Sequence, residues 1–162
     1  MILVLMGVSG SGKTTLGVLL AKALNWTFLD ADDFHPVANI AKMSAGQPLN
    51  DADRIPWLNT LRERLELALS REESLVLACS ALKSSYRDIL HPRADEPIHF
   101  VYLRGSSELI AERLAGRGGH FMNPSLLASQ LATLEEPAGA FHVDISEPPE
   151  KLVALIRSHF RL

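Results

Sequence analysis

Short apolar runs alternate along the chain with longer segments whose apolar residues recur at helical spacing. Five runs have the length of strands, at residues 2–6, 26–29, 74–79, 98–103 and, more weakly, 141–145. In the segments between them, apolar residues stand three or four positions apart, which places them on one face of a helix. Strands that alternate with helices in this way predict a five-stranded parallel sheet with helices on both faces.

Composition limits the class of protein. The 162 residues are enough for one domain with a core, and no repeat, linker or low-complexity tract divides them, so we expect a single domain over residues 1–162. The net charge of −3 argues against nucleic acid as a partner. No apolar run approaches the length that spans a membrane, and the N-terminal run lacks the basic leader of a signal peptide. A single cysteine, Cys79, fits a reducing compartment, so a cytoplasmic location is expected.

Directly after the first apolar run, the sequence GVSGSGKTT fits G-x-x-x-x-G-K-[ST], the pattern of a phosphate-binding loop. A strand before it and a helical pattern after it supply the required context, and argue against a mere glycine-rich turn. In such a loop Lys13 reaches the β- and γ-phosphates, and the hydroxyl of Thr14 holds Mg²⁺. The residues expected to bind ATP here are Gly7, Val8, Ser9, Gly10, Ser11, Gly12, Lys13, Thr14 and Thr15.

Carboxylates gather where the second run ends, at Asp30, Asp32 and Asp33. Ligands of open parallel sheets bind at the carboxyl ends of the strands, so this position faces the phosphate loop. The third run ends in Ala-Cys-Ser and offers no aspartate for a metal. We therefore expect Asp30 to support Mg²⁺ beside Thr14, and Asp32 to lie near the accepting hydroxyl. Capping of a helix by Asp32 or Asp33 is the structural alternative.

Cations that could line an acceptor pocket are Lys42 and Arg54, in a segment rich in Gly, Pro, Asn and Asp, and Arg87 after the third run. A solvated surface position is the alternative for each of them. Asp53 is expected to cap a helix that begins near residues 55–56, and Ser80 to open the helix after the third run.

A second pair of arginines, Arg113 and Arg117, stands four residues apart and therefore on one helix face. A glycine-rich exit and His120 follow, which predicts a small mobile lid at roughly residues 115–125 that carries arginines to the phosphates. Favourable interaction with the helix dipole is the alternative for the arginines, and a packing or surface role for His120.

Other residues are interpreted as scaffold. Trp57 and Cys79 are expected to be packing residues rather than catalytic ones. The helix near residues 55–70 and the last helix, at about residues 149–160, each present an apolar face that predicts core positions, namely Leu58, Leu61, Leu65, Ala68, Leu152, Leu155, Ile156 and Phe160.

Four stretches together resemble one family. These are GVSGSGKTT, HPVANIAKMSAGQPLNDADRIPWL, CSALKSSYRDIL and HFMNPSLLASQLATLEEP, which occur in this order and span most of residues 7–137. The chain resembles the gluconate kinases (gluconokinases), small ATP-dependent sugar-acid kinases. The resemblance implies a three-layer P-loop NTPase fold of the nucleoside-monophosphate-kinase type with a small lid. Ala31 and His91 depart from the family pattern, and neither touches the assignments below.

The resemblance implies transfer of the γ-phosphate of ATP to the 6-hydroxyl of D-gluconate, with Mg²⁺ as the cofactor and a homodimer as the assembly. In that scheme Lys13, Asp32 and Arg117 are catalytic, Thr14 and Asp30 hold the metal, and Arg113 stacks on adenine. Arg54 is the first choice for the gluconate carboxylate, with Lys42 and Arg87 behind it. His35 is a partner for a hydroxyl, and His120 is a further candidate on the substrate side.

Two alternatives stay open from the residues alone. The same chemistry on another acceptor, such as shikimate or a nucleoside monophosphate, is the nearer one. A nucleotide-dependent switch without transfer is the other. A GTPase switch would carry an N-K-x-D motif that reads the base, which this sequence lacks.

Overall fold

The computed structural model describes residues 1–116 and 124–162. Its strands are β1 (Ile2–Met6), β2 (Thr27–Asp30), β3 (Leu75–Ala78), β4 (Ile98–Arg104) and β5 (Phe141–Asp144). Its helices are α1 (Lys13–Leu24), the short 3₁₀ helix η1 (Ala31–Phe34), α2 (Val37–Ser44), α3 (Asp51–Ser70), α4 (Ser84–Leu90), α5 (Ser107–Ala115), α6 (Pro124–Thr133) and α7 (Pro149–Phe160).

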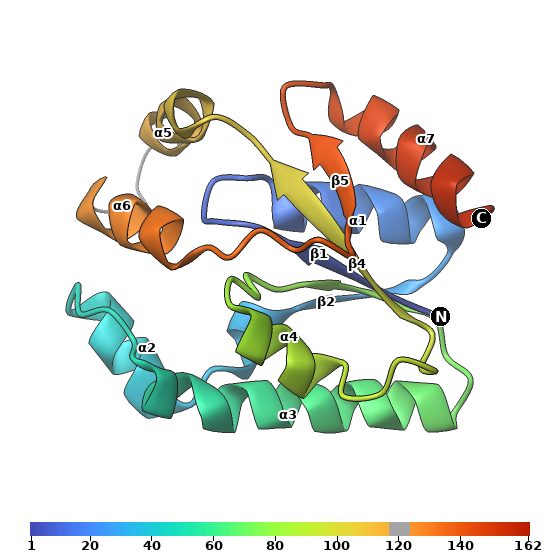
Figure 1. Cartoon of the computed structure of the whole chain (residues 1–162), viewed down its shortest axis with the longest axis horizontal. Coiled ribbons are helices and arrows are strands. Elements are labelled where there is room, and N and C mark those ends of the chain that lie inside the picture. Colours follow the sequence, from blue (N-terminus) through green and yellow to red (C-terminus); the bar gives the residue numbers. More distant parts are fainter. Residues whose placement is uncertain (117–123) are drawn as a thin grey trace.

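The strands form one parallel sheet in the order β2-β3-β1-β4-β5, as the alternation of runs predicted. Figure 1 shows the three layers, with α3 and α4 on one face of the sheet and α1 and α7 on the other. The phosphate loop, α2, α5 and α6 gather at one end of the sheet, away from both chain termini (Figure 1). The carboxyl ends of the strands therefore meet at the end of the sheet where these elements stand.

Both faces of the sheet are buried. Ile2, Val4 and Met6 pack toward α3 and α4, while Leu3 and Leu5 pack toward α1 and α7. This division follows from the strand period of two, and it explains why the first run is apolar throughout. The predicted core face of α3 is confirmed, because Leu58, Leu61, Leu65 and Ala68 are all buried.

Three local predictions were wrong. Helix α3 begins at Asp51 rather than near residue 55, because Asn50 and Asp53 form a capping box upstream of Pro56. Helix α4 begins at Ser84, so Ser80 does not open it. The backbone N–H of Ser84 instead donates to the carboxylate of Glu135, 51 residues further along the chain. In α7, Leu155 is 43% exposed, since the helix turns Leu152 and Ile156 toward the sheet instead.

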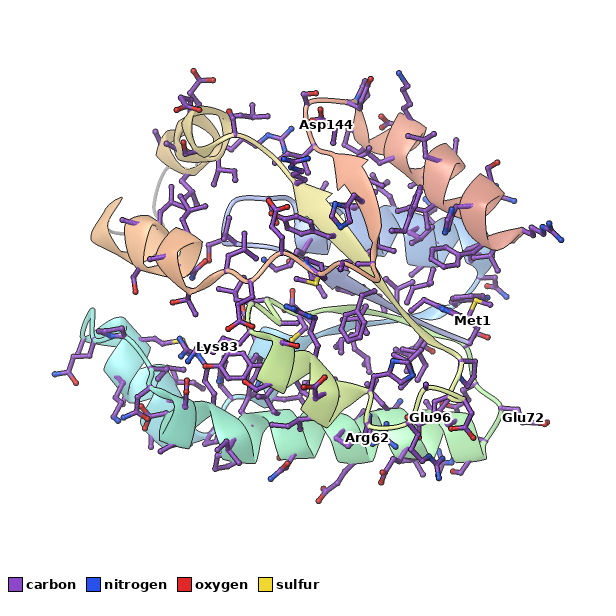
Figure 2. All side chains as sticks on the ribbon, in the orientation of Figure 1. Met1, Arg62, Glu72, Lys83, Glu96 and Asp144 are labelled. Carbon is purple, nitrogen blue, oxygen red and sulfur yellow. The ribbon has the colours of Figure 1, made fainter. Side chains whose placement is uncertain are left out.

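The opposite end of the sheet is fastened by an ion pair. Arg62 donates to both carboxylate oxygens of Glu96, at 2.7 and 2.6 Å, and Glu96 is only 6% exposed. Figure 2 shows the two residues together below the sheet, on the side of the chain termini. This charge pair belongs to the scaffold, because it lies far from the phosphate loop. In the described part of the chain, no helix combines the length and apolarity needed to cross a membrane.

Candidate active site

The phosphate loop turns tightly between β1 and α1. At Gly7 a β-carbon would lie 2.9 Å from the Ser11 hydroxyl oxygen and 3.0 Å from the Leu103 carbonyl oxygen, so no side chain fits. Gly12 precedes α1 with a φ of 94°, a left-handed conformation that other residues adopt only with strain. The loop is therefore shaped by backbone requirements that glycine alone meets at these two positions.

Helix α1 begins at Lys13, and no side chain of the described residues caps its first turn. An uncapped helix start directed at a loop of this kind is a binding site for phosphate, because its N–H groups and the helix dipole attract anions. The Lys13 ammonium donates to the carbonyl oxygens of Gly7 and Val8, at 3.0 Å each. It therefore lies over the first residues of the loop, at the end that faces the sheet.

Thr14 and Asp30 form a pair of oxygen donors that could hold a metal. The Thr14 hydroxyl donates to one Asp30 oxygen at 2.8 Å, and the backbone N–H of Asp32 donates to the other at 3.1 Å. Mg²⁺ prefers oxygen ligands and usually keeps water and substrate phosphates around it. Among the described residues no group of three or more His, Cys, Asp or Glu could hold a metal ion.

One cavity of about 370 Å³ opens beside the phosphate loop. Its walls come from the loop, the end of β2, η1, the segment before α3, the end of β3, and α6. It brings together many of the residues that the sequence singled out, namely Ser9, Gly10, Gly12, Lys13, Thr14, Asp30, Asp32, His35 and Arg54. Phosphate-binding, acidic and basic groups thus share one concave surface.

Asp32 stands at the open side of this cavity, and its side chain is 86% exposed. The surrounding protein and then the charge of Asp30 raise its pKa above the usual value, whereas Lys13 acts in the opposite direction. A carboxylate with a raised pKa accepts a proton more readily. The position and the chemistry of Asp32 therefore suit a proton acceptor next to the phosphate loop.

His35 is held from both sides. Its ring stacks on Trp57 with centroids 4.3 Å apart, and its Nδ1 lies 3.3 Å from the Asn39 amide nitrogen. The same amide nitrogen donates to the Asp53 carbonyl oxygen at 2.9 Å, which identifies it as the donor toward His35 as well. The Nδ1 of His35 therefore accepts a hydrogen bond, and the neutral ring carries its hydrogen on Nε2. Burial lowers the pKa of His35, which keeps the ring neutral near pH 7. Nε2 lies 3.8 Å from an Asp32 oxygen, so this N–H lies beside the carboxylate in the cavity.

Arg54 lines the cavity from α3 and is steadied by Tyr86. A guanidinium nitrogen donates to the Tyr86 hydroxyl at 3.2 Å, and the hydroxyl donates to Asp51. Lys83 binds both oxygens of Asp51 at 2.8 Å, and Figure 2 shows Lys83 at the start of α4, facing α2 and α3. The carboxylate of Asp51 is thus committed to Lys83 and Tyr86, and the partner of Arg54 is a neutral phenol.

Lys42 and Arg87, the other two predicted cations, are engaged elsewhere. The Lys42 ammonium lies 2.6 Å from an Asp53 oxygen, and that contact lowers the pKa of Asp53. Arg87 donates to the carbonyl oxygens of Ala81 and Leu82, at 3.0 and 3.1 Å. Neither is among the described residues that line the 370 Å³ cavity.

A second hollow of about 260 Å³ lies on the other side of the loop. Arg113 lines it from α5 and donates to the Ile145 carbonyl oxygen at 2.6 Å. Gly10, Ser11 and Gly12 of the loop and Thr15 of α1 also line the hollow. Arg117, His120 and most of the expected lid at residues 115–125 lie outside the described residues.

The packing predictions for the two reactive-looking residues are confirmed. Cys79 is buried, and burial raises the pKa of its thiol to about 12, which suits a packing residue. Trp57 is 2% exposed, and its indole N–H donates to the Ala31 carbonyl oxygen at 2.7 Å. It serves as the platform under His35.

Two residues that shape the site escaped the sequence analysis. Asn39 of α2 orients His35, which precedes that helix by two residues, and no helical spacing in the sequence links the two. Gln130 of α6 contacts Ser9 of the phosphate loop across 121 residues, and no spacing in the sequence announces such a contact.

Comparison with known proteins identifies the group to which the chain belongs. A family model described as an AAA domain matches residues 2–137. A gluconokinase of Gluconobacter oxydans is 47% identical, with 98% of this chain and 90% of that protein covered. The thermoresistant gluconokinase of Escherichia coli is 43% identical over 94% of this chain and 89% of its own length. The crystal structure of a gluconokinase from Sinorhizobium meliloti superposes with a TM-score of 0.84 at 46% identity, covering 94% and 86% of the two chains. The chain therefore belongs to the gluconokinase family of P-loop kinases.

Proposed function

We propose that this protein transfers the γ-phosphoryl group of ATP to the 6-hydroxyl of D-gluconate, giving 6-phospho-D-gluconate and ADP. One observation carries the proposal. A single cavity joins the phosphate loop to a carboxylate, Asp32, and to a guanidinium, Arg54. These are the groups that transfer to the hydroxyl of an anionic acceptor requires, because the hydroxyl needs a proton acceptor and the anion needs a cation. The likeness to gluconokinases supports D-gluconate as that acceptor.

On the donor side, the loop and the first turn of α1 hold the phosphates. Lys13 moves from its carbonyl partners to the β- and γ-phosphate oxygens, where it offsets the negative charge that spreads over them in the transition state. Arg113 lies over the adenine from the neighbouring hollow. In the same scheme Arg117 reaches the transferring group from the lid.

Magnesium fits the oxygens of Thr14 and Asp30, which lie next to each other at the start of α1 and the end of β2. When bound, the ion would neutralise phosphate charge and fix the geometry of the triphosphate. Asp30 also accepts the backbone N–H of Asp32, so the residue that would support the metal orients the segment that carries the proton acceptor.

On the acceptor side, the Arg54 guanidinium binds the carboxylate of D-gluconate, and the Nε2–H of His35 donates to one of the hydroxyl groups of D-gluconate. Asp32 takes the proton of the 6-hydroxyl as the new bond between this oxygen and the γ-phosphorus forms. The bond between that phosphorus and the bridging oxygen breaks, and its electron pair leaves with ADP. Proton, phosphoryl group and charge are then all accounted for.

The remaining expectations are proposals of the same kind. A homodimer is proposed from the resemblance to gluconokinases. The cytoplasm is proposed as the location because the single cysteine fits a reducing compartment.

A coupled assay of ADP release tests the function. Purified protein is incubated with ATP and Mg²⁺ and with D-gluconate, shikimate or AMP in parallel. We expect ADP release with D-gluconate that exceeds release with the other two acceptors by at least about 100-fold, because a site built around one anionic polyol leaves polar groups unpaired with the others. Greater release with shikimate or AMP would contradict the acceptor. Tight ATP binding without release in any arm would contradict transfer itself.

A further inference from the structure

The phosphate loop is fastened to α6 through one side chain. The Gln130 amide oxygen accepts the backbone N–H of Ser9 at 2.7 Å, and its amide nitrogen donates to the Ser9 hydroxyl at 3.1 Å. A primary amide is suited to this double contact because it presents a donor and an acceptor side by side. Gln130 and Ser9 both line the 370 Å³ cavity, so the contact lies in the wall of the acceptor site.

Ser9 occupies a particular place in the loop. The Lys13 ammonium rests on the carbonyls of Gly7 and Val8, immediately before Ser9. Because the lysine of such a loop serves the β- and γ-phosphates, this part of the loop lies at the γ-phosphate end. Ser9 is therefore positioned between the group that is transferred and the cavity that holds its acceptor.

Helix α6 is itself fixed to the scaffold at its far end. Just beyond it, the backbone N–H of Glu135 donates to the Leu82 carbonyl oxygen at 2.9 Å. The Glu135 carboxylate accepts the N–H of Ser84 at 2.7 Å, at the start of α4. The segment from Gln130 to Glu135 thus contacts two neighbouring loops, the phosphate loop and the loop after β3, at residues 79–83.

We propose that Gln130 is a positioning residue for phosphoryl transfer. It holds Ser9, and through Ser9 the γ-phosphate end of the loop, at the distance from the acceptor hydroxyl that transfer needs. The N–H of Ser9 is directed to α6, so the loop keeps its shape at this point through a side chain and not through the phosphate it binds. Misplacement of a reacting group by about 1 Å costs on the order of 100-fold in rate, so a residue with this task acts on turnover more than on affinity.

The proposal rests on the proposed phosphoryl transfer and is tested by removing the amide. Gln130→Met keeps the length of the side chain and loses both hydrogen bonds. We expect kcat with D-gluconate to fall about 10- to 100-fold, while KM for D-gluconate and the affinity for an ATP analogue change less than about threefold. Thr133→Ala serves as the control, because Thr133 lies on the same helix and bonds only to the Ser129 carbonyl oxygen among its described contacts. Its kcat should match the wild type.

A double-mutant cycle separates positioning from simple loss of structure. Ser9→Ala removes the hydroxyl half of the contact, so its effect on kcat should largely disappear when Gln130 is already Met. Additive effects on log kcat, or an unchanged kcat in Gln130→Met, would overturn the proposal. So would a fall in kcat matched by an equal fall in the folded fraction, measured by thermal unfolding. A wild-type protein that releases no ADP with D-gluconate would instead contradict the proposed function. The wild-type assay therefore separates failure of the proposed function from failure of the proposal for Gln130.

Discussion

The donor half and the acceptor half of the candidate site are formed in different ways. The donor half is one unbroken segment, residues 7–14, whose shape depends on backbone conformations such as the left-handed φ of Gly12. The acceptor half is assembled from side chains on η1, α3 and α6, which meet only in the folded protein. The first can be read from a local pattern, while the second depends on tertiary contacts.

In the acceptor half, the basic side chains differ in the groups to which they are bonded. Lys42 is paired with Asp53, and Lys83 with Asp51. Arg54 lines the cavity with a neutral phenol as its hydrogen-bond partner. A cation bonded to a neutral group retains its charge for an anionic ligand, whereas a cation paired with a carboxylate must first give up that pair. This difference favours the proposal of Arg54 as the cation that binds the anionic acceptor, over basic residues that look equivalent in the sequence.

The largest effect should come from Asp32, where the two halves meet. Asp32→Asn removes the proton acceptor and keeps the shape, so kcat should fall about 100- to 10,000-fold while an ATP analogue still binds. ADP release and fluorescence titration measure the two quantities. Asp33→Asn is the matched control, since Asp33 is exposed on the same short helix and does not line the described cavity. Full turnover of Asp32→Asn would remove Asp32 from the mechanism.

Arg54 should govern the acceptor alone. In Arg54→Ala we expect KM for D-gluconate to rise about 10- to 100-fold, because a charge-assisted hydrogen bond to the carboxylate is lost, with little change in KM for ATP. Lys42→Ala should raise it less, since this ammonium is bound to Asp53. Arg157→Ala, on the last turn of α7, controls for the loss of one positive charge. A rise in KM for ATP instead of D-gluconate would contradict the assignment.

A substitution at Gly12 should affect the donor half, and therefore KM for ATP, without affecting KM for D-gluconate. A β-carbon at Gly12 would meet nothing closer than an Arg113 nitrogen at 3.7 Å, so Gly12→Ala isolates the cost of its φ of 94°. That strain is on the order of 1–2 kcal/mol, which corresponds to about a 10-fold higher KM for ATP if the loop relaxes away from its binding shape. KM for D-gluconate should not change. Gly139→Ala, at a position with open space around it, is the control. Equal effects on both substrates would argue that the two halves are not separable.

Much of the fold follows from the sequence for a physical reason. Both faces of a parallel sheet are covered, so its strands are short apolar runs, and Ile2–Met6 stands out against the amphipathic helices around it. The residues at which helices begin were harder to predict from the sequence. The start of α3 depends on a capping box of Asn50 and Asp53, a local pattern that the sequence analysis missed. The start of α4 depends on Glu135, a residue 51 positions away from Ser84, which no local pattern reveals.

The candidate site divides along the same line. A phosphate loop is a contiguous pattern, so its residues were predictable one by one. The state of Lys42, Arg54 and Arg87 was not, because a basic side chain has the same appearance in a sequence whether it meets a carboxylate, a phenol or a carbonyl oxygen. Gln130 escaped for a related reason, since its partner is 121 residues away and a glutamine has no charge to mark it.

The smallest expected effect concerns the free energy of unfolding, and it tests whether the charged side chain of Asp32 destabilises the folded protein. Its raised pKa means that the folded protein binds this proton more tightly than the unfolded chain, whose reference value is 3.8. The contribution of Asp32 to the free energy of unfolding is then most favourable below pH 3.8 and is lost as the pH rises through the raised value. At pH 7 Asp32→Asn should therefore be slightly more stable than the wild type.

The size of this gain is limited, because Asp32 is exposed and water screens its charge, so we expect less than about 1 kcal/mol. For a domain of this length that is a rise in Tm of about 2–4 °C at most. Thermal unfolding of wild type, Asp32→Asn and Asp33→Asn without nucleotide, from pH 8 down to pH 4, should show the advantage of Asp32→Asn narrowing toward acid. A variant that is less stable than the wild type at pH 7, or an advantage independent of pH, would contradict the raised pKa. A narrowing advantage would mean that the proposed proton acceptor is tolerated by the fold and not required by it, as expected where the surrounding protein and a second carboxylate raise the pKa of an aspartate.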